Sequence, residues 1–166
     1  WNTISLIGMP GAGKSTVGVI LAKLAGLRFI DTDLDIQVRE EATLHEIVQA
    51  HGYLRLRAIE EEVLLDLPLD HALVSTGGSV VYSEAIMARL KAAGPVVYIE
   101  VDVPTLEQRV AATPHRGIAS DSSQSFADVY AERTPLYEHY ADIRIGSRDM
   151  SADEVAARIL EKLPIS

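Results

Sequence analysis

The chain has 166 residues, which is enough for one domain with a sizeable core but not for two. It contains no cysteine, so disulfides and thiolate chemistry are excluded. A formal net charge of −9 argues against nucleic acid as the main partner, because nucleic-acid binding usually needs a basic face. No apolar run approaches the roughly 20 residues that span a bilayer. We therefore expect one domain over residues 1–166 with neither a nucleic-acid nor a membrane partner. We also expect the protein to be cytoplasmic and a monomer.

Apolar strands and segments of helical periodicity alternate along the chain. In chain order, strands are predicted at 3–8, 28–31, 73–75, 96–101 and 141–145, and helices at 14–25, 35–67 with a break near 51–52, 83–93, 105–112 and 151–163. The last helix opens with the capping-box residues Ser151 and Glu154. Strands separated by helices indicate a parallel sheet with helices on both faces, which is a three-layer α/β fold.

A phosphate-binding loop is predicted directly after the first strand. The stretch GMPGAGKS at 8–15 fits the pattern G-x-x-x-x-G-K-[ST] and lies between a strand and a helix, as the motif requires. Its glycines let backbone N–H groups turn toward an anion, and the following helix adds the positive end of its dipole. Lys14 reaches the β- and γ-phosphates, and the Ser15 hydroxyl can ligate Mg²⁺. The candidate nucleotide contacts are Gly11, Ala12, Gly13, Lys14, Ser15 and Thr16.

Other motifs distinguish a kinase from a GTPase switch or a mechanical ATPase. The sequence has no N-K-x-D pattern for guanine recognition. Asp102 follows the fourth strand, but Pro104 opens a helix after it, so we interpret Asp102 as a loop or cap residue. Asp31 and Asp33 leave the second strand two residues apart, a spacing that puts both on one face of an extended segment. One could hold the water ligands of Mg²⁺, and the other could accept a proton from a substrate hydroxyl.

The motifs taken together resemble the shikimate kinase family. They are GMPGAGKST, then DTD, then Leu56-Arg57-x-x-Glu60, then Thr76-Gly77-Gly78, then Arg133-Thr-Pro135-Leu-Tyr137 with Ala141-Asp142 soon after. The resemblance covers essentially the whole chain, with the motifs in the right order and at the right spacing. It implies a nucleoside-monophosphate-kinase-like fold with a five-stranded parallel sheet and a mobile lid at about 113–125. It also implies ATP and Mg²⁺, and transfer of the γ-phosphate to the 3-hydroxyl of a small molecule, shikimate, in aromatic amino-acid biosynthesis.

The same resemblance implies which residues bind the acceptor. By position, Asp33 would bind the substrate hydroxyls and serve as the base. Arg57 and Arg133 would clamp the substrate carboxylate, a task that suits the planar, bidentate guanidinium group. Gly77 and Gly78 would offer backbone N–H groups to the substrate.

On the nucleotide side, the resemblance places Asp31 with Ser15 near the metal. Arg116 would be the lid arginine that reaches the transferring phosphate, which makes it catalytic together with Lys14 and Asp33. Arg109 would lie along the adenine. A transferring phosphoryl group needs positive charge that arrives late and excludes water, and Arg116 lies where a hinged lid would be.

Each arginine also has a simpler interpretation. Arg57 could be a solvated helix charge near the acidic run 60–62, which we expect to be mostly a solvated helix face. Arg109 could be a cation on a helix face. The direction of Arg133 is expected to be fixed by Pro135, which would make the local backbone irregular. Glu60 could hold Arg57 in its fork geometry as a supporting carboxylate.

Two departures from the family pattern affect the acceptor side. Ser79 stands where the family usually has a third glycine. It changes the pocket if that position needs a close backbone approach or φ > 0, and it is tolerated if the position only ends the turn. The stretch 116–119 reads RGIA where the family typically has RPLL. These differences leave two alternatives open: a kinase of the same fold acting on a different small acceptor, or a non-catalytic nucleotide-binding regulator.

Overall fold

One five-stranded sheet organises the chain. The structure, a computed structural model, describes residues 2–112 and 123–164. In this part of the chain the strands pair in the order β2-β3-β1-β4-β5, and every pairing is parallel. The strands are β1 (Thr3–Ile7), β2 (Arg28–Asp31), β3 (Ala72–Ser75), β4 (Val96–Glu100) and β5 (Ile143–Gly146). Because all five strands run in one direction, their carboxyl ends lie along one edge of the sheet, where ligands bind in folds of this type.

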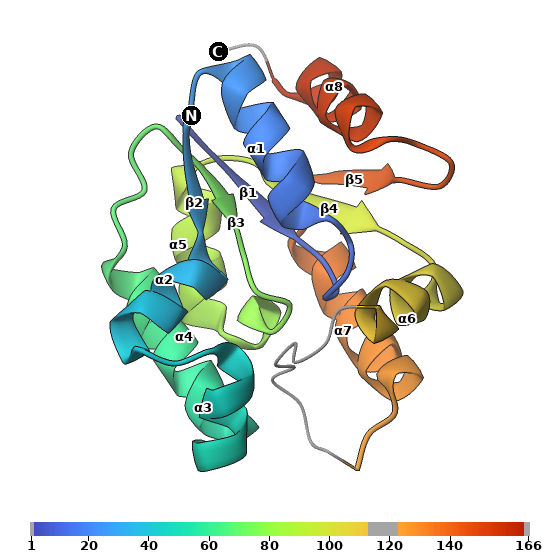
Figure 1. The fold of residues 1–166 in the computed structure, drawn as a ribbon. Helices are drawn as coiled ribbons and strands as arrows, with labels where there is room; N and C mark the ends of the chain where they lie inside the picture. The colour runs from blue at the N-terminus through green and yellow to red at the C-terminus, as the bar shows by residue number, and fades with distance from the viewer. Residues whose placement is uncertain (1, 113–122, 165–166) are drawn as a thin grey trace.

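Helices cover both faces of the sheet, which confirms the predicted three-layer α/β architecture. They are α1 (Lys14–Ala25), α2 (Thr32–Glu40), α3 (Leu44–His51), α4 (Tyr53–Asp66), α5 (Glu84–Ala93), α6 (Val103–Ala111), α7 (Phe126–Tyr140) and α8 (Ala152–Lys162), with a 3₁₀ turn η1 (Val80–Tyr82). Helices α1 and α8 pack together on one face, and α5 and α7 lie on the other (Figure 1). Helices α2, α3 and α4 contact one another beside β2.

The core lies around the central strands. All five residues of β1 are buried, as are all four of β3 and the first four of β4. Continuous burial of this kind is expected for parallel strands that have helices on both faces. It fixes the loops that leave β1 and β3, and these two loops carry most of the predicted site.

Two predictions of elements differ from the structure: α7 was not predicted, and the segment 35–67, predicted as helical with one break near 51–52, belongs to three helices, the first of which begins before it. Helix α2 begins at Thr32, since the Asp31 carboxylate accepts hydrogen bonds from the backbone N–H groups of Asp33 (3.1 Å) and Leu34 (3.3 Å). Asp33 therefore lies in the first turn of a helix. The expectation that Asp31 and Asp33 share one face of an extended segment is wrong.

Left-handed residues explain the two interruptions. Glu41 (φ 52°) ends α2, and Gly52 (φ 85°) separates α3 from α4 at the predicted break. Elsewhere the boundaries differ from the predicted ones by two residues or fewer, as is common at frayed ends. Asp102 is the N-cap of α6, as predicted, and accepts a hydrogen bond from the Thr105 backbone N–H at 3.2 Å.

Helix α7 runs through Pro135, so the expectation of an irregular backbone there is wrong. A proline removes one hydrogen bond from a helix, but its φ is compatible with helical geometry. The buried residues of α7 lie at helical spacing and hold the helix against the sheet: Val129, Arg133 and Tyr137. The direction of Arg133 is thus set by a continuous helix.

Two further predictions concern membrane-spanning segments and the lid. Of the helices that the structure describes, none combines the length and the apolar character needed to cross a membrane. The predicted lid at 113–125 falls mostly outside the described residues, which resume at Ser123. Arg116 is among the residues outside the described ranges.

Candidate active site

The loop between β1 and α1 has the backbone geometry that the phosphate-loop motif predicts. Gly11 (φ 88°) and Gly13 (φ 87°) adopt the left-handed conformation that favours glycine, and Gly13 is the N-cap of α1. The Lys14 side chain is buried, and its ammonium donates to the backbone oxygens of Gly8 (2.7 Å) and Met9 (2.8 Å). A helix N-terminus and an ammonium group are thereby held at one loop, an arrangement that suits a phosphate chain.

Ser15 and Asp31, the candidate metal ligands, are in direct contact. The Ser15 hydroxyl donates to Asp31 Oδ2 at 3.0 Å and lies 3.2 Å from the Ser75 hydroxyl at the end of β3. Asp31 Oδ1 caps α2, which fixes the carboxylate. No group of three or more His, Cys, Asp or Glu suited to a metal ion is found among the described residues. The Ser15 hydroxyl and the Asp31 carboxylate fit Mg²⁺, because this ion is commonly bound through one or two protein oxygens, water and substrate phosphates.

Asp33 lies directly against Gly77, in the loop that follows β3. A methyl group at Gly77 would come within 2.8 Å of Asp33 Oδ1 and 2.5 Å of Glu60 Oε2. Only hydrogen fits at that Cα, so the backbone of the loop approaches both carboxylates closely. The arrangement puts a possible proton acceptor beside backbone N–H groups that can bind a substrate hydroxyl.

Gly78 connects this loop with the phosphate loop and with α7. A methyl group at Gly78 would lie 2.8 Å from Arg133 Nη1 and 2.9 Å from Pro10 Cδ. The Tyr137 hydroxyl donates to the Gly78 carbonyl oxygen at 2.5 Å. The Gly77–Gly78 turn therefore lies between the candidate acceptor residues and the loop that would hold the donor phosphates.

Arg57 from α4 and Arg133 from α7 converge on Tyr82. The Arg57 Cζ lies 3.9 Å from the centre of the Tyr82 ring and 5.0 Å from that of Tyr53. The Arg133 Cζ lies 5.4 Å from the Tyr82 ring centre, and its Nε donates to the Tyr82 hydroxyl at 3.4 Å. Arg133 is only 1% exposed. Two cations are thus held near one another, which suits a carboxylate ligand.

Glu60 is buried and hydrogen-bonded to Ser79. The Ser79 hydroxyl donates to Glu60 Oε1 at 2.7 Å, and both residues are buried. Burial raises the pKa of Glu60 to about 7; the Asp33 carboxylate adds to the rise, while the Ser79 hydrogen bond and the two arginines, Arg133 and Arg57, oppose it. The expectation that run 60–62 is a solvated face is wrong for Glu60, because this residue faces the core from α4, and holds for Glu61 and Glu62, which are exposed.

A cavity of about 270 Å³ adjoins the phosphate loop. Arg109 from α6 lies in its wall and donates to the Gly11 carbonyl oxygen at 3.0 Å. The cavity is lined by Gly11, Ala12, Gly13, Thr16, Val17, Arg109, Ser147, Met150, Ala152 and Val155. Its position beside the loop and its partly apolar wall suit the base and ribose of a nucleotide.

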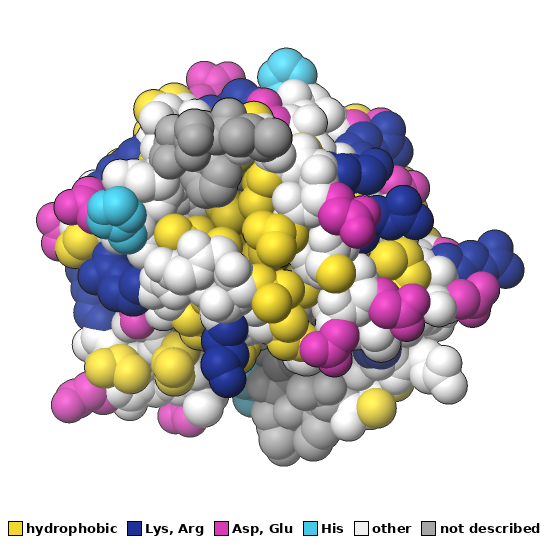
Figure 2. All heavy atoms as spheres, turned by 90° about the horizontal axis from the view of Figure 1, so that it is seen from above, with side chains coloured by type: hydrophobic (Ala, Val, Ile, Leu, Met, Phe, Trp, Pro, Cys, Tyr) yellow, Lys and Arg dark blue, Asp and Glu magenta, His cyan; other side chains and the backbone are white. Residues whose placement is uncertain are grey.

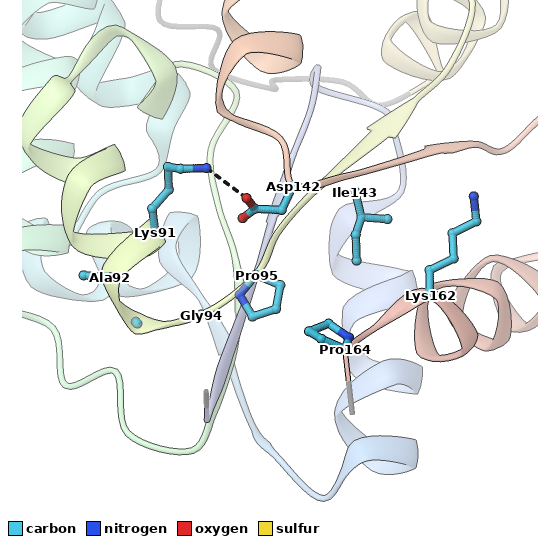
Figure 3. Close-up of a pocket in the computed structure, with 9 residues that line it drawn as sticks. Lys91, Ala92, Gly94, Pro95, Asp142, Ile143, Lys162 and Pro164 are labelled. Atoms are coloured by element: carbon cyan, nitrogen blue, oxygen red, sulfur yellow. Dashed lines mark hydrogen bonds and ion pairs between the residues drawn. The ribbon is translucent and has the colours of Figure 1, made fainter. Parts of the chain in front are cut away.

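A larger cavity lies at the opposite edge of the sheet, near the amino ends of β4 and β5. It measures about 590 Å³ and is lined by Lys91, Ala92, Ala93, Gly94, Pro95, Asp142, Ile143, Lys162 and Pro164. Lys91 forms an ion pair with Asp142 across it (Figure 3). On the face shown in Figure 2, Lys and Arg side chains are scattered among Asp and Glu around a central strip of hydrophobic side chains. Lys14 and Asp33, the candidate catalytic residues within the described ranges, do not line this cavity.

Fold and site together define a phosphate-loop phosphotransferase. A sequence model described as shikimate kinase matches residues 10–164. A shikimate kinase of Histophilus somni is 36% identical, covering 96% of this chain and 94% of that protein, and one of Colwellia psychrerythraea is 37% identical, covering 98% and 96%. The chain therefore belongs to the shikimate kinase family and is an ATP-dependent phosphotransferase.

Solved structures agree with this assignment. A shikimate kinase from Acinetobacter baumannii in complex with shikimate superposes with a TM-score of 0.89 at 32% identity, covering 96% of this chain and 91% of that one. A shikimate kinase from Aquifex aeolicus gives a TM-score of 0.80 at 29% identity, with coverage of 96% and 94%. The five-stranded parallel sheet that the resemblance implied is confirmed.

Sequence reasoning missed several residues of the site. Ser75, beside Ser15, and Ser147, in the wall of the cavity that adjoins the phosphate loop, both lie at the carboxyl edge of the sheet. The rule that ligands bind at that edge could have pointed to them. No sequence signal marked Tyr82, because its contacts come from α4 and α7, far away in the chain.

Proposed function

We propose that this protein transfers the γ-phosphate of ATP to the 3-hydroxyl of shikimate. The observation that carries this proposal is the Gly77–Gly78 turn, which touches Asp33, Arg133 and Pro10 of the phosphate loop. Donor and acceptor residues are therefore contiguous. The complex of the Acinetobacter baumannii relative with shikimate supports the choice of acceptor.

In this proposal, Arg57 and Arg133 bind the carboxylate of the acceptor and orient its ring. The backbone N–H groups of Gly77 and Gly78 and the Asp33 carboxylate bind its hydroxyls. Asp33 takes the proton from the reacting hydroxyl. The oxygen of that hydroxyl forms a bond to the γ-phosphorus while the bond from the γ-phosphorus to the bridging oxygen breaks, and ADP leaves. Positioning supplies much of the rate, because the reacting groups are held together before reaction.

Residues of the phosphate loop would hold the donor. Lys14 and the N–H groups of residues 11–16 neutralise the phosphate chain, and Ser15 with Asp31 would hold Mg²⁺, which neutralises charge on the transferring group when bound. Arg109 would contact the adenine. The role of Arg116 at the transferring phosphate rests on the family resemblance alone.

An ADP-release assay with a panel of acceptors tests the proposal. Shikimate, quinate, gluconate and adenosine monophosphate are offered separately with ATP and Mg²⁺. We expect shikimate alone to stimulate ADP release well above the rate without acceptor. Stimulation by another member of the panel would favour a same-fold kinase for a different acceptor. ATP binding without stimulation by any of them would favour a non-catalytic regulator.

A further inference from the structure

Tyr82 lies at the centre of the candidate carboxylate clamp. The Arg57 Cζ lies over its ring, 3.9 Å from the ring centre, and the Arg133 Cζ lies 5.4 Å from the same centre. The tyrosine comes from η1, directly after the turn that contains Gly77 and Gly78. One aromatic side chain is thus in contact with both cations and follows the acceptor loop directly in the chain.

The hydroxyl of Tyr82 takes part in a directed chain of hydrogen bonds. It accepts from Arg133 Nε at 3.4 Å and donates to Glu132 Oε1 at 2.6 Å. Glu132 Oε2 in turn accepts from Gln124 Nε2 at 2.8 Å. The hydrogen bonds from Tyr82 and Gln124 lower the pKa of Glu132, so this carboxylate stays ionised at neutral pH.

These contacts offset the repulsion between the guanidinium groups of Arg57 and Arg133. Two guanidinium groups that face one ligand repel each other when the ligand is absent, and Arg133 is almost completely buried. The negative face of an aromatic ring attracts a stacked cation, and the Glu132 carboxylate adds an opposing charge at the hydroxyl end. A guanidinium group over an aromatic ring can stack on it with its face, because its N–H groups lie in the plane of the group.

We propose that Tyr82 is a positioning residue for the acceptor carboxylate: its ring orients Arg57 and its hydroxyl orients Arg133. This inference rests on the proposed function, in which the two arginines bind that carboxylate. Tyr82 acts through the arginines and does not touch the reacting atoms. It therefore increases affinity for a planar carboxylate more than it affects the chemical step.

Kinetics of Tyr82→Leu and Tyr82→Phe, with Tyr140→Leu as a matched control, test this role. Tyr140 is half-buried at the far end of α7. Each variant is measured with shikimate and with its carboxamide analogue, which keeps the hydroxyls but lacks the charge. We expect Tyr82→Leu to raise the KM for shikimate about 5- to 20-fold, the range of a cation–π contact, with kcat and the KM for ATP changed less than about twofold.

The amide analogue separates positioning from pocket shape. We expect the KM for the amide to change less than about twofold in Tyr82→Leu, because the missing charge removes the interaction that the tyrosine supports. Tyr82→Phe keeps the ring but loses the hydroxyl that accepts from Arg133 and donates to Glu132. It should raise the KM for shikimate about two- to fivefold, as for loss of the hydrogen bond that orients Arg133. Tyr140→Leu should leave both constants unchanged.

An equal rise in KM for shikimate and the amide, or no rise in Tyr82→Leu, would overturn the proposed role. If Tyr82→Leu does not fold, Tyr82→Phe provides the test. A ratio of the KM for shikimate to the KM for the amide that equals the wild-type ratio would overturn the proposed role. A wild-type protein without shikimate-dependent ADP release would instead overturn the proposed function. The two failures are therefore distinguishable.

Discussion

Ser79 and Glu60 form a buried hydrogen bond of 2.7 Å beside the candidate acceptor site. Ser79 has a φ of −94°, so its backbone does not need glycine. The position where the family usually has a third glycine accepts serine here because the side chain finds a buried acceptor. Of the two reasons for a glycine at this position, the need for a positive φ is ruled out.

The same pair predicts a pH dependence of stability. The pKa of Glu60 in the folded protein, about 7, lies above its ordinary value of 4.5, so the native state holds a proton that the unfolded state releases between these values. This contribution is fully present below about pH 4.5 and is lost as the pH rises through about 7. Glu60→Gln removes it. Between pH 5 and 8 we expect wild type to lose on the order of 3 kcal/mol relative to the variant.

Urea denaturation of both proteins across this pH range measures the effect. Glu61→Gln, at an exposed position one residue further along α4, is the control and should follow wild type. Parallel curves for wild type and Glu60→Gln would contradict the raised pKa.

Asp33→Asn tests the proposed base. We expect kcat to fall about 10²- to 10⁴-fold, because the amide cannot accept the proton from the acceptor hydroxyl. ATP affinity, measured by calorimetry, should not change. Asp35→Asn, two residues further in the same helix, should retain nearly full activity. A fully active Asp33→Asn variant would remove the base from the proposal.

Gly77→Ala tests the close approach of backbone and carboxylates. The added methyl group would come within 2.5 Å of Glu60 Oε2 and 2.8 Å of Asp33 Oδ1, so something must shift. We expect kcat/KM for the acceptor to fall about 100-fold, as for a displacement of reacting groups by about 1 Å. Gly146→Ala is the control, since its methyl group would meet nothing within 4 Å. Equal activity of the two variants would argue against this geometry.

Arg57→Lys tests bidentate binding of the acceptor carboxylate. An ammonium group keeps the charge but loses the planar fork, so the KM for shikimate should rise roughly 10- to 100-fold with little change in the KM for ATP. Arg55→Lys, at an exposed position on the same helix, should leave both values unchanged. If Arg57 is solvated and has no role in binding, Arg57→Lys and Arg55→Lys will have the same KM for shikimate.

The parts of the site that were predictable from sequence are local ones. The phosphate loop could be located because its glycines, Lys14 and Ser15 form a contiguous motif between a strand and a helix. Asp102 was recognised as a cap residue from the proline that follows it two positions later. In both cases the physics acts over a few residues.

Most errors in the predicted helices and in the predicted exposure of side chains arose where tertiary contacts determine the structure. The start of α2 is an exception: Asp31 caps it through backbone N–H groups two and three residues along the chain, a local signal that the helical periodicity did not show. Glu60 is buried although it begins an acidic run, because Ser79 approaches from another loop. Pro135 does not end α7, since burial of its neighbours outweighs the lost hydrogen bond. Short-range patterns carry no information about such partners.

Direct identification of the product tests the central proposal most sharply. Wild type is incubated with ATP, Mg²⁺ and shikimate, and the products are followed by ³¹P NMR with mass spectrometry. We predict one phosphate monoester at the 3-position of shikimate for each ADP released, and none with Asp33→Asn. Release of ADP with free phosphate and no ester, or an ester only on another acceptor, would contradict it.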